Sequence, residues 1–172
     1  MSINLPPYSC RGVTYIGREA FWANHNLTEI VFPEGISTIQ YCSFARCELL
    51  SEIIIPNNVT TIEDYAFHNG EKPTTNLKSI IIGNGVVQIS PIAFARNFDL
   101  ESITIYATNP PVLGYNNGEH SSAGNYPLYE ISECPIYVPA GSVETYKAAD
   151  GWKEMADRIY AITMNTGGGT TD

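Results

Sequence analysis

Side chains that could carry out hydrolytic chemistry are few and scattered in this sequence of 172 residues. His120 is followed directly by Ser121 and Ser122, but a serine nucleophile needs a base within hydrogen-bond reach and an acid that orients the base. Neighbours in sequence do not provide that geometry, and no Gly-x-Ser-x-Gly nucleophile elbow is present. The other two histidines, His25 and His68, lie far away along the chain. We therefore expect no catalytic residues and a protein that is not an enzyme.

Metal and cofactor chemistry has equally little support. None of the four cysteines forms a Cys-x-x-Cys pair, and the spacing leaves open whether any of them form disulfides: Cys10, Cys42, Cys47 and Cys134. The neighbours Glu63 and Asp64, and Asp99 with Glu101, could touch a calcium ion, but no Asp-x-Asp-x-Asp-Gly loop surrounds them. Solvated surface charge is the simpler interpretation. No phosphate-binding glycine motif is present, so we expect neither a metal nor a cofactor.

Non-covalent binding is better represented, by aromatic and amide side chains in the segment 106–135. It contains Tyr115, Asn116, Tyr126 and Tyr129, and ring faces beside amides suit a polar ligand of low charge such as a glycan. The alternative is that the tyrosines bury their rings and fix a long loop to the rest of the domain.

Composition limits the class of partner. The chain has 44% hydrophobic and 16% charged residues, as a globular domain does, and its net charge is −9. That charge argues against nucleic acid and against anionic membrane surfaces. No apolar run is long enough to span a membrane. The first residues, MSINLPPYSC, lack the basic start and apolar core of a signal peptide, so we expect either a cytosolic protein or part of a longer chain.

An internal repeat defines the elements that position these residues. Aromatic residues after a small residue recur at steps of 23, 23 and 27, namely Phe21, Phe44, Phe67 and Phe94. A Leu-x-x-Ile-x-(Ile/Phe) pattern and a (Val/Ile)-x-x-Ile pattern follow the same period. The single longer step falls in GEKPTTN, which has the composition of a surface loop. Shared period and shared interruption indicate a repeat architecture.

Each unit starts with a short β-branched strand, and in three units Pro33, Pro56 or Gly83 ends it. The Ala-Phe element is too short for a long helix, so we expect turns, a 3₁₀ segment or a short strand there. One unit cannot bury its apolar face alone, and stacking turns equivalent residues into buried columns. The predicted columns are Leu27/Leu50/Leu77/Leu100, Ile30/Ile53/Ile80/Ile103, Phe32/Ile55/Ile82/Ile105, Ile16/Ile39/Ile62/Ile89 and Phe21/Phe44/Phe67/Phe94.

A further column contains small or amide residues: Asn24, Cys47, Gly70 and Asn97. An inward Asn can satisfy backbone groups that a tight turn leaves unpaired, and a buried Cys fills the same space. We interpret Cys47 as a packing residue rather than a reactive or bridging thiol.

Strand residues between the core positions must face outward, in two rows. The polar row is Glu29, Glu52, Ser79 and Ser102, and the apolar row is Val31, Ile54, Ile81 and Thr104. An exposed apolar row can mark a partner surface. The alternative is that Val, Ile and Thr simply favour strands wherever they point.

The units LTEIVFPEGISTIQYCSFARC and LSEIIIPNNVTTIEDYAFHNG resemble the BspA-type leucine-rich repeat of bacterial surface proteins, over about residues 13–105. The resemblance implies a right-handed solenoid with a parallel sheet on one face and turns, 3₁₀ segments or short strands on the other. It also implies export to the cell surface or beyond, and roles in adhesion. The segment from Ile136 to Ile162 resembles the C-terminal part of such proteins from gut-type anaerobes. Few repeats and no visible export signal are the departures from the family.

The ends of the stack must cover its core. We expect residues 1–12 to be an N-terminal cap or truncated repeat, 13–105 the repeats, 106–135 a long loop insertion, 136–163 a small α/β C-terminal cap and 164–172 a flexible tail. In the cap we predict a strand at Ile136, a helix capped by Ser142, a final strand from Ile159, and Trp152 over the core.

These observations favour a non-enzymatic cell-surface or secreted protein that binds a protein or an extracellular-matrix component through its sheet face. One alternative is a structural spacer module of a longer surface protein. Another is glycan binding through the tyrosines of 106–129.

Overall fold

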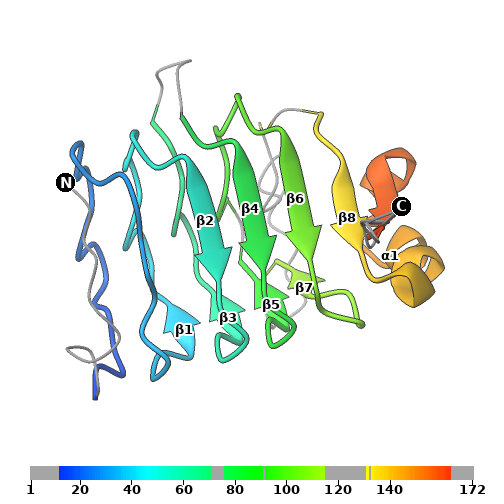
Figure 1. Ribbon diagram of the computed structural model, residues 1–172, viewed down its shortest axis with the longest axis horizontal. Coiled ribbons are helices and arrows are strands. Elements are labelled where there is room, and N and C mark those ends of the chain that lie inside the picture. The colour runs from blue at the N-terminus through cyan, green and yellow to red at the C-terminus, as the bar shows by residue number, and fades with distance from the viewer. Residues whose placement is uncertain (1–11, 71–75, 91, 115–130, 132, 164–172) are drawn as a thin grey trace, which may run out of the picture.

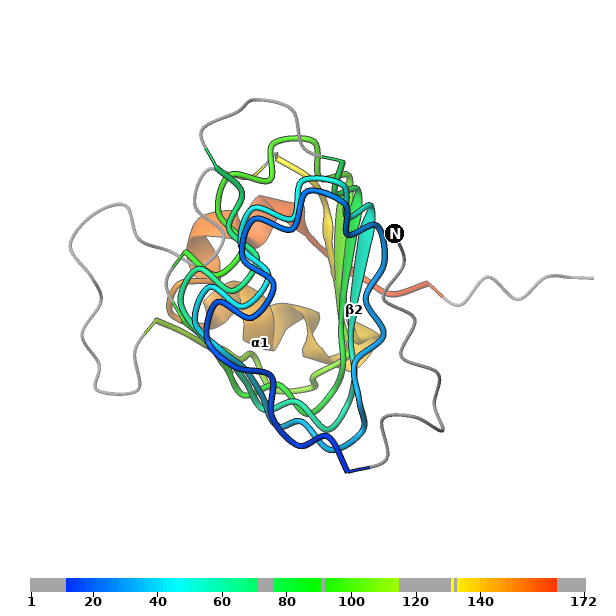
Figure 2. The ribbon, with the colours of Figure 1, turned by 90° about the vertical axis from the view of Figure 1, so that its left-hand side faces the viewer.

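The chain forms a stack of coils with two parallel sheets, closed at one end by short helices (Figure 1). The computed structural model describes residues 12–70, 76–90, 92–114, 131 and 133–163. Viewed along the stack, successive coils superpose and enclose the apolar core (Figure 2). The expected solenoid is confirmed.

The main sheet has the order β2-β4-β6-β8-β9, and its adjacent strands are parallel. Its strands are β2 (Glu52–Ile55), β4 (Ser79–Ile82), β6 (Ser102–Ile105), β8 (Ile136–Val138) and β9 (Ile159–Ala161). The register places Ile53, Ile80 and Ile103 side by side, all of them buried. The predicted columns at the strand positions are therefore confirmed from β2 onward.

A second sheet of two-residue strands lines another side of the coil. Its order is β1 (Thr38–Ile39), β3 (Thr61–Ile62), β5 (Gln88–Ile89) and β7 (Val112–Leu113). Strand β7 corrects the expectation of a loop from residue 106, because the coil continues to Leu113, which pairs with Ile89. The pattern is hidden in the sequence because Pro110 replaces the first Val of the Val-x-x-Ile pair.

The first unit departs from the others. A strand was predicted around Ile30 and Phe32, but of residues 28–32 only Ile30 forms a bridge, and it is half-buried. Phe32 packs edge-on against Phe44 and Phe67, with ring centroids 5.5 and 6.3 Å apart. The equivalent residues of later units are isoleucines. We attribute the loss of regular pairing with β2 to this bulkier ring.

The aromatic column is confirmed on the turn side of the coil. Centroids of Phe21 and Phe44 are 5.1 Å apart, those of Phe44 and Phe67 5.5 Å, and those of Phe67 and Phe94 5.4 Å, all stacked face to face. Backbone hydrogen bonds run alongside, as from the Phe44 N–H to the Ala66 carbonyl. The residue two positions before each ring has a left-handed φ between 52° and 59°, which lets the chain turn within one residue: Glu19, Cys42, Tyr65 and Ile92.

The C-terminal end of the stack is closed by η1 (Ala140–Ser142), α1 (Val143–Ala148) and η2 (Lys153–Arg158), with α1 across the end of the coil (Figures 1 and 2). Tyr146 and Trp152 are fully buried, and they donate hydrogen bonds to the carbonyls of Ala107 (2.9 Å) and Pro111 (2.8 Å). The placement of Trp152 over the core is confirmed. The capping role of Ser142 is wrong, because its side chain makes no cap hydrogen bond and its backbone already belongs to η1.

Truncation of the aromatic column should be costly at its centre. Phe67→Ala removes a ring that contacts Phe44, Phe94 and Phe32. We expect the free energy of unfolding to fall by about 3–5 kcal/mol, because the cavity cannot be refilled by rigid neighbouring coils. Urea denaturation followed by circular dichroism measures this. Phe98→Ala is the control, since Phe98 is 41% exposed, and a loss of equal size there would contradict the stacking argument.

A buried hydroxyl offers the opposite effect. Ser43 is fully buried, its Oγ has no hydrogen-bond partner among the described residues, and the buried alanines Ala66 and Ala93 hold the same place in later units. Ser43→Ala should raise the free energy of unfolding by about 1 kcal/mol, because it removes an unsatisfied polar atom. The reciprocal change Ala66→Ser should lower it by a similar amount. A less stable Ser43→Ala protein would show that the hydroxyl has a partner.

Candidate binding surface

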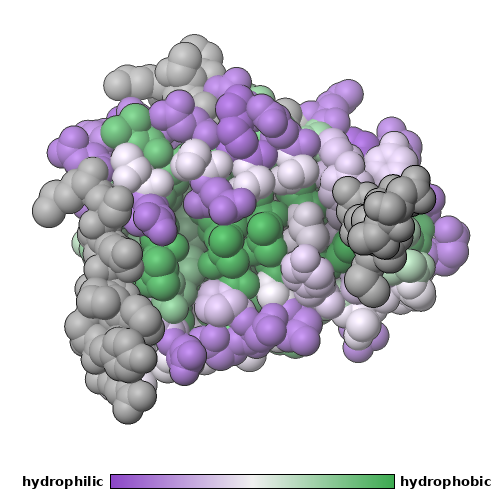
Figure 3. Space-filling view, in the orientation of Figure 1, coloured by the Kyte–Doolittle hydropathy of each residue, from purple (hydrophilic) through white to green (hydrophobic). Residues whose placement is uncertain are grey.

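The outward residues of the main sheet form one continuous apolar row. Register places Ile54 beside Ile81 and Ile81 beside Thr104, and the row then continues to Tyr137 on β8 and Tyr160 on β9. Ile54 is 51% and Tyr160 50% exposed, while Ile81, Thr104 and Tyr137 are half-buried. Val31, from the first unit, is 40% exposed. Figure 3 shows apolar side chains gathered over β2 and β4, with polar side chains beyond both ends of these strands.

Tyr137 and Tyr160 were missed as surface residues by sequence reasoning. The signal was available, because alternation in Ile136-Tyr137-Val138 points the ring away from the core. Both strands lie outside the repeat, so only their parallel pairing shows that they extend the same face.

The predicted polar row lies beside the apolar one. Glu52, Ser79 and Ser102 are in register, and the Ser79 hydroxyl donates a hydrogen bond of 2.9 Å to Glu52 Oε1. Glu29 is exposed and belongs to the segment that does not pair regularly with β2. The sheet face therefore carries carboxylates at its N-terminal side and hydroxyls further along.

A groove of about 500 Å³ separates the segment 28–32 from β2. It exists because the first unit does not continue the sheet. The lining consists of both outward rows and parts of the strand ends: Thr28, Glu29, Ile30, Val31, Phe32, Ser51, Glu52, Ile54 and Pro56. Four predicted surface residues, Glu29, Val31, Glu52 and Ile54, thus meet in one depression.

The predicted ligand loop lies outside the described residues, which exclude 115–130. This applies to Tyr115, Asn116, Tyr126 and Tyr129, and equally to His120, Ser121 and Ser122. A glycan site in this loop stays a prediction.

The remaining candidates for chemistry make separate contacts. His25 Nδ1 lies 3.7 Å from Glu48 Oε2, and the Glu63 carboxylate accepts a hydrogen bond of 2.8 Å from the Tyr41 N–H. The Lys78 ammonium lies 3.3 Å from the Glu101 carboxylate. Within the described ranges, no three His, Cys, Asp or Glu side chains gather closely enough to hold a metal ion. No helix in those ranges is long and apolar enough to cross a membrane.

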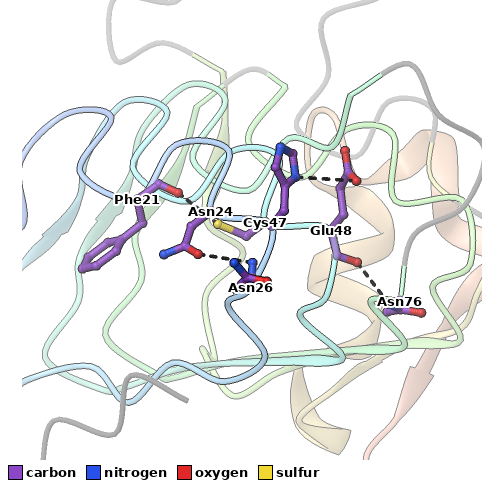
Figure 4. A network of polar contacts seen from close by, with 7 residues as sticks. Phe21, Asn24, Asn26, Cys47, Glu48 and Asn76 are labelled. Carbon is purple, nitrogen blue, oxygen red and sulfur yellow. Dashed lines mark hydrogen bonds and ion pairs between the residues drawn. The ribbon is translucent and has the colours of Figure 1, made fainter. Parts of the chain in front are cut away.

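Two members of the small-residue column satisfy backbone carbonyls of the preceding coil, and Figure 4 shows the contact of Cys47. Cys47 is buried, and its thiol donates to the Phe21 carbonyl at 3.2 Å. The Asn97 amide donates to the equivalent Phe67 carbonyl at 3.1 Å. Gly70 does not fill the place between them, contrary to the prediction. Asn69 does, one residue earlier, because its side chain turns inward and donates to Asn97 Oδ1 at 2.7 Å.

Burial raises the pKa of the Cys47 thiol to about 11 from an ordinary value of 9.0. The thiol is protonated in both states below about pH 9, and the unfolded chain releases its proton first as the pH rises. The free energy of unfolding should therefore fall between about pH 9 and 11, and fall less in Cys47→Ala. Burial also raises the pKa of Tyr146, so the free energy of unfolding falls at high pH for this second reason in both the wild type and Cys47→Ala.

Alkylation gives a second measure of the same burial. We expect iodoacetamide to modify native Cys47 far more slowly than the half-buried Cys42, with peptide mapping by mass spectrometry as the assay. Unfolding in urea should abolish the difference. Equal native rates would contradict a buried thiol.

Comparison with known families supports the repeat assignment. The model described as the BspA type leucine rich repeat region matches six copies over residues 2–114, so the match ends one residue after β7. No curated protein matches the sequence. Because the matched region spans more than half of the chain and contains strands β1 to β7, the chain belongs to the BspA-type leucine-rich repeat family.

Proposed function

We propose that this protein is a non-enzymatic surface or secreted repeat protein that binds a protein or an extracellular-matrix component through the outer face of the main sheet. The observation that carries the proposal is the apolar row in register across five parallel strands, from Ile54 to Tyr160. Membership of a family associated with bacterial surface proteins supports the location.

The chemistry of the face suits a macromolecule. Exposed aliphatic and tyrosine side chains lie about 4.8 Å apart from strand to strand, which gives an extended strip rather than an enclosed pocket. Aromatic and aliphatic side chains bordered by polar groups are the usual composition of a protein interface.

The face is also pre-organised. On β2, β4, β6 and β8 the outward residue of the row lies between two buried neighbours, as Ile54 does between Ile53 and Ile55. Parallel backbone pairing fixes the strands, so little backbone entropy is lost on binding. A spacer module would have no need of an exposed apolar row, and we therefore prefer binding to that alternative.

The test is a charge placed in the centre of the row. Ile54→Lys should weaken binding to an immobilised panel of extracellular-matrix proteins at least tenfold, because an ammonium replaces an apolar contact. Biolayer interferometry measures the affinities, and circular dichroism verifies the fold. The matched control is Val87→Lys, since Val87 is 61% exposed and lies next to β5, away from the main sheet. Equal binding by wild type and Ile54→Lys would exclude the sheet face.

A further inference from the structure

We propose that the groove between residues 28–32 and β2 binds an extended peptide segment in which a Lys or Arg stands two residues from an aliphatic residue. This inference rests on the proposed function, because the groove is the N-terminal part of the same face. It adds the chemistry of the partner.

The outward side chains that line the groove form two pairs, one acidic and one aliphatic. Glu29 and Glu52 hold equivalent positions in successive units, 23 residues apart, and Val31 and Ile54 hold the next outward positions. Both pairs line the groove, so two carboxylates stand at one level and two aliphatic side chains at the next. Two residues of extended chain advance about 6.6 Å.

An extended ligand has the same period. Its side chains at positions i and i+2 point to one side, so a cation can lie between the carboxylates while an aliphatic side chain lies between Val31 and Ile54. A parallel segment would present the cation first and an antiparallel segment the aliphatic residue first. The spacing is the same in both directions.

The negative charge of the groove favours a cationic side chain in the ligand. Among the described residues that line the groove, two are carboxylates and none is Lys or Arg. Glu52 accepts one hydrogen bond from Ser79, which leaves further acceptor capacity on its oxygens. The net charge of −9 adds a field that attracts cationic partners.

The backbone of β2 favours an extended ligand. The carbonyls of Ser51 and Ile55 accept hydrogen bonds from the β4 side, from the N–H groups of Lys78 and Gly83. By the alternation of a parallel strand, the carbonyls of Glu52 and Ile54 point to the opposite side, toward residues 28–32. Ile30 forms the one bridge among residues 28–32, so this side of β2 lacks regular strand pairing, and an extended ligand can pair there only beside that bridge. A segment of about five residues spans the groove.

The test is a titration of the ¹⁵N-labelled protein with short peptides, followed by NMR chemical shifts, which detects weak binding and locates it. The peptide Ser-Lys-Thr-Leu-Thr-Lys-Ser contains the spacing in both directions. Ser-Glu-Thr-Leu-Thr-Glu-Ser reverses the charge, and Ser-Lys-Thr-Ser-Thr-Lys-Ser lacks the aliphatic residue. We expect the first peptide to bind at least tenfold more tightly than the other two, with shifts at Glu29, Val31, Glu52 and Ile54.

Variants assign the selectivity to the carboxylates. Glu29→Gln with Glu52→Gln should weaken binding of the first peptide at least tenfold. Glu144→Gln with Glu154→Gln removes the same charge from exposed positions of the C-terminal helices and should leave the affinity within twofold. Equal weakening in both double variants would show general attraction to a negative protein and would overturn the inference. The inference would also be overturned if the Lys and Glu peptides bound equally well, or if neither peptide bound.

The two proposals fail separately. If Ile54→Lys abolishes matrix binding while the peptide titration shows no selectivity, the sheet face stands and the cationic segment does not. If the Lys peptide binds selectively in the groove but Ile54→Lys leaves matrix binding unchanged, the groove stands and the proposed matrix-binding role of the face does not.

Discussion

Commensurate stacking of the coils is the constraint on which the rest of the structure depends. Parallel strands lie about 4.8 Å apart, and the phenylalanine rings on the other side of the coil are stacked at 5.1–5.5 Å. Because the two spacings nearly agree, strand pairing in the sheet and ring stacking in the aromatic column can both form without one coil sliding past the next. A slip of one residue would bring the outward rows into the core. The inward columns therefore fix where each outward side chain stands, which couples the stability of the protein to the geometry of its surface.

The C-terminal end shows how such a stack is closed without losing its face. Tyr146 and Trp152 bury their rings against the last coil and direct their polar atoms to the carbonyls of Ala107 and Pro111. These two carbonyls are thereby satisfied in a place that water cannot reach. Strands β8 and β9 add to the main sheet although their sequences do not follow the repeat. The same segment thus closes the core and extends the outer face of the main sheet.

Sequence periodicity was sufficient for the solenoid, the buried columns and the two outward rows, because each depends only on which residues are equivalent. It did not reveal β7, where Pro110 interrupts the pattern, or the inward turn of Asn69 in place of Gly70. It also predicted a regular first strand, whereas only Ile30 of residues 28–32 forms a bridge, a difference that we attribute to the ring of Phe32. These differences share a cause. A repeat pattern identifies positions, whereas one bulkier residue or one rotated side chain changes pairing locally. The groove could not be foreseen, since it follows from the strand that did not form.

Stacking equivalent residues in register brings like charges together, and the irregular first unit changes how two such carboxylates are placed. Like charges directly opposite each other on neighbouring strands destabilise a sheet, and an unbroken stack would place Glu29 opposite Glu52. Later units avoid the problem with Ser79 and Ser102, and Ser79 donates a hydrogen bond to Glu52. In the first unit the segment 28–32 departs from regular pairing, and both carboxylates then line a depression instead of a ladder. A cation between them would offset their mutual repulsion, whereas an anion would increase it. The irregular unit therefore presents a negatively charged depression, while the regular strands beside it present an outward row of mainly apolar side chains.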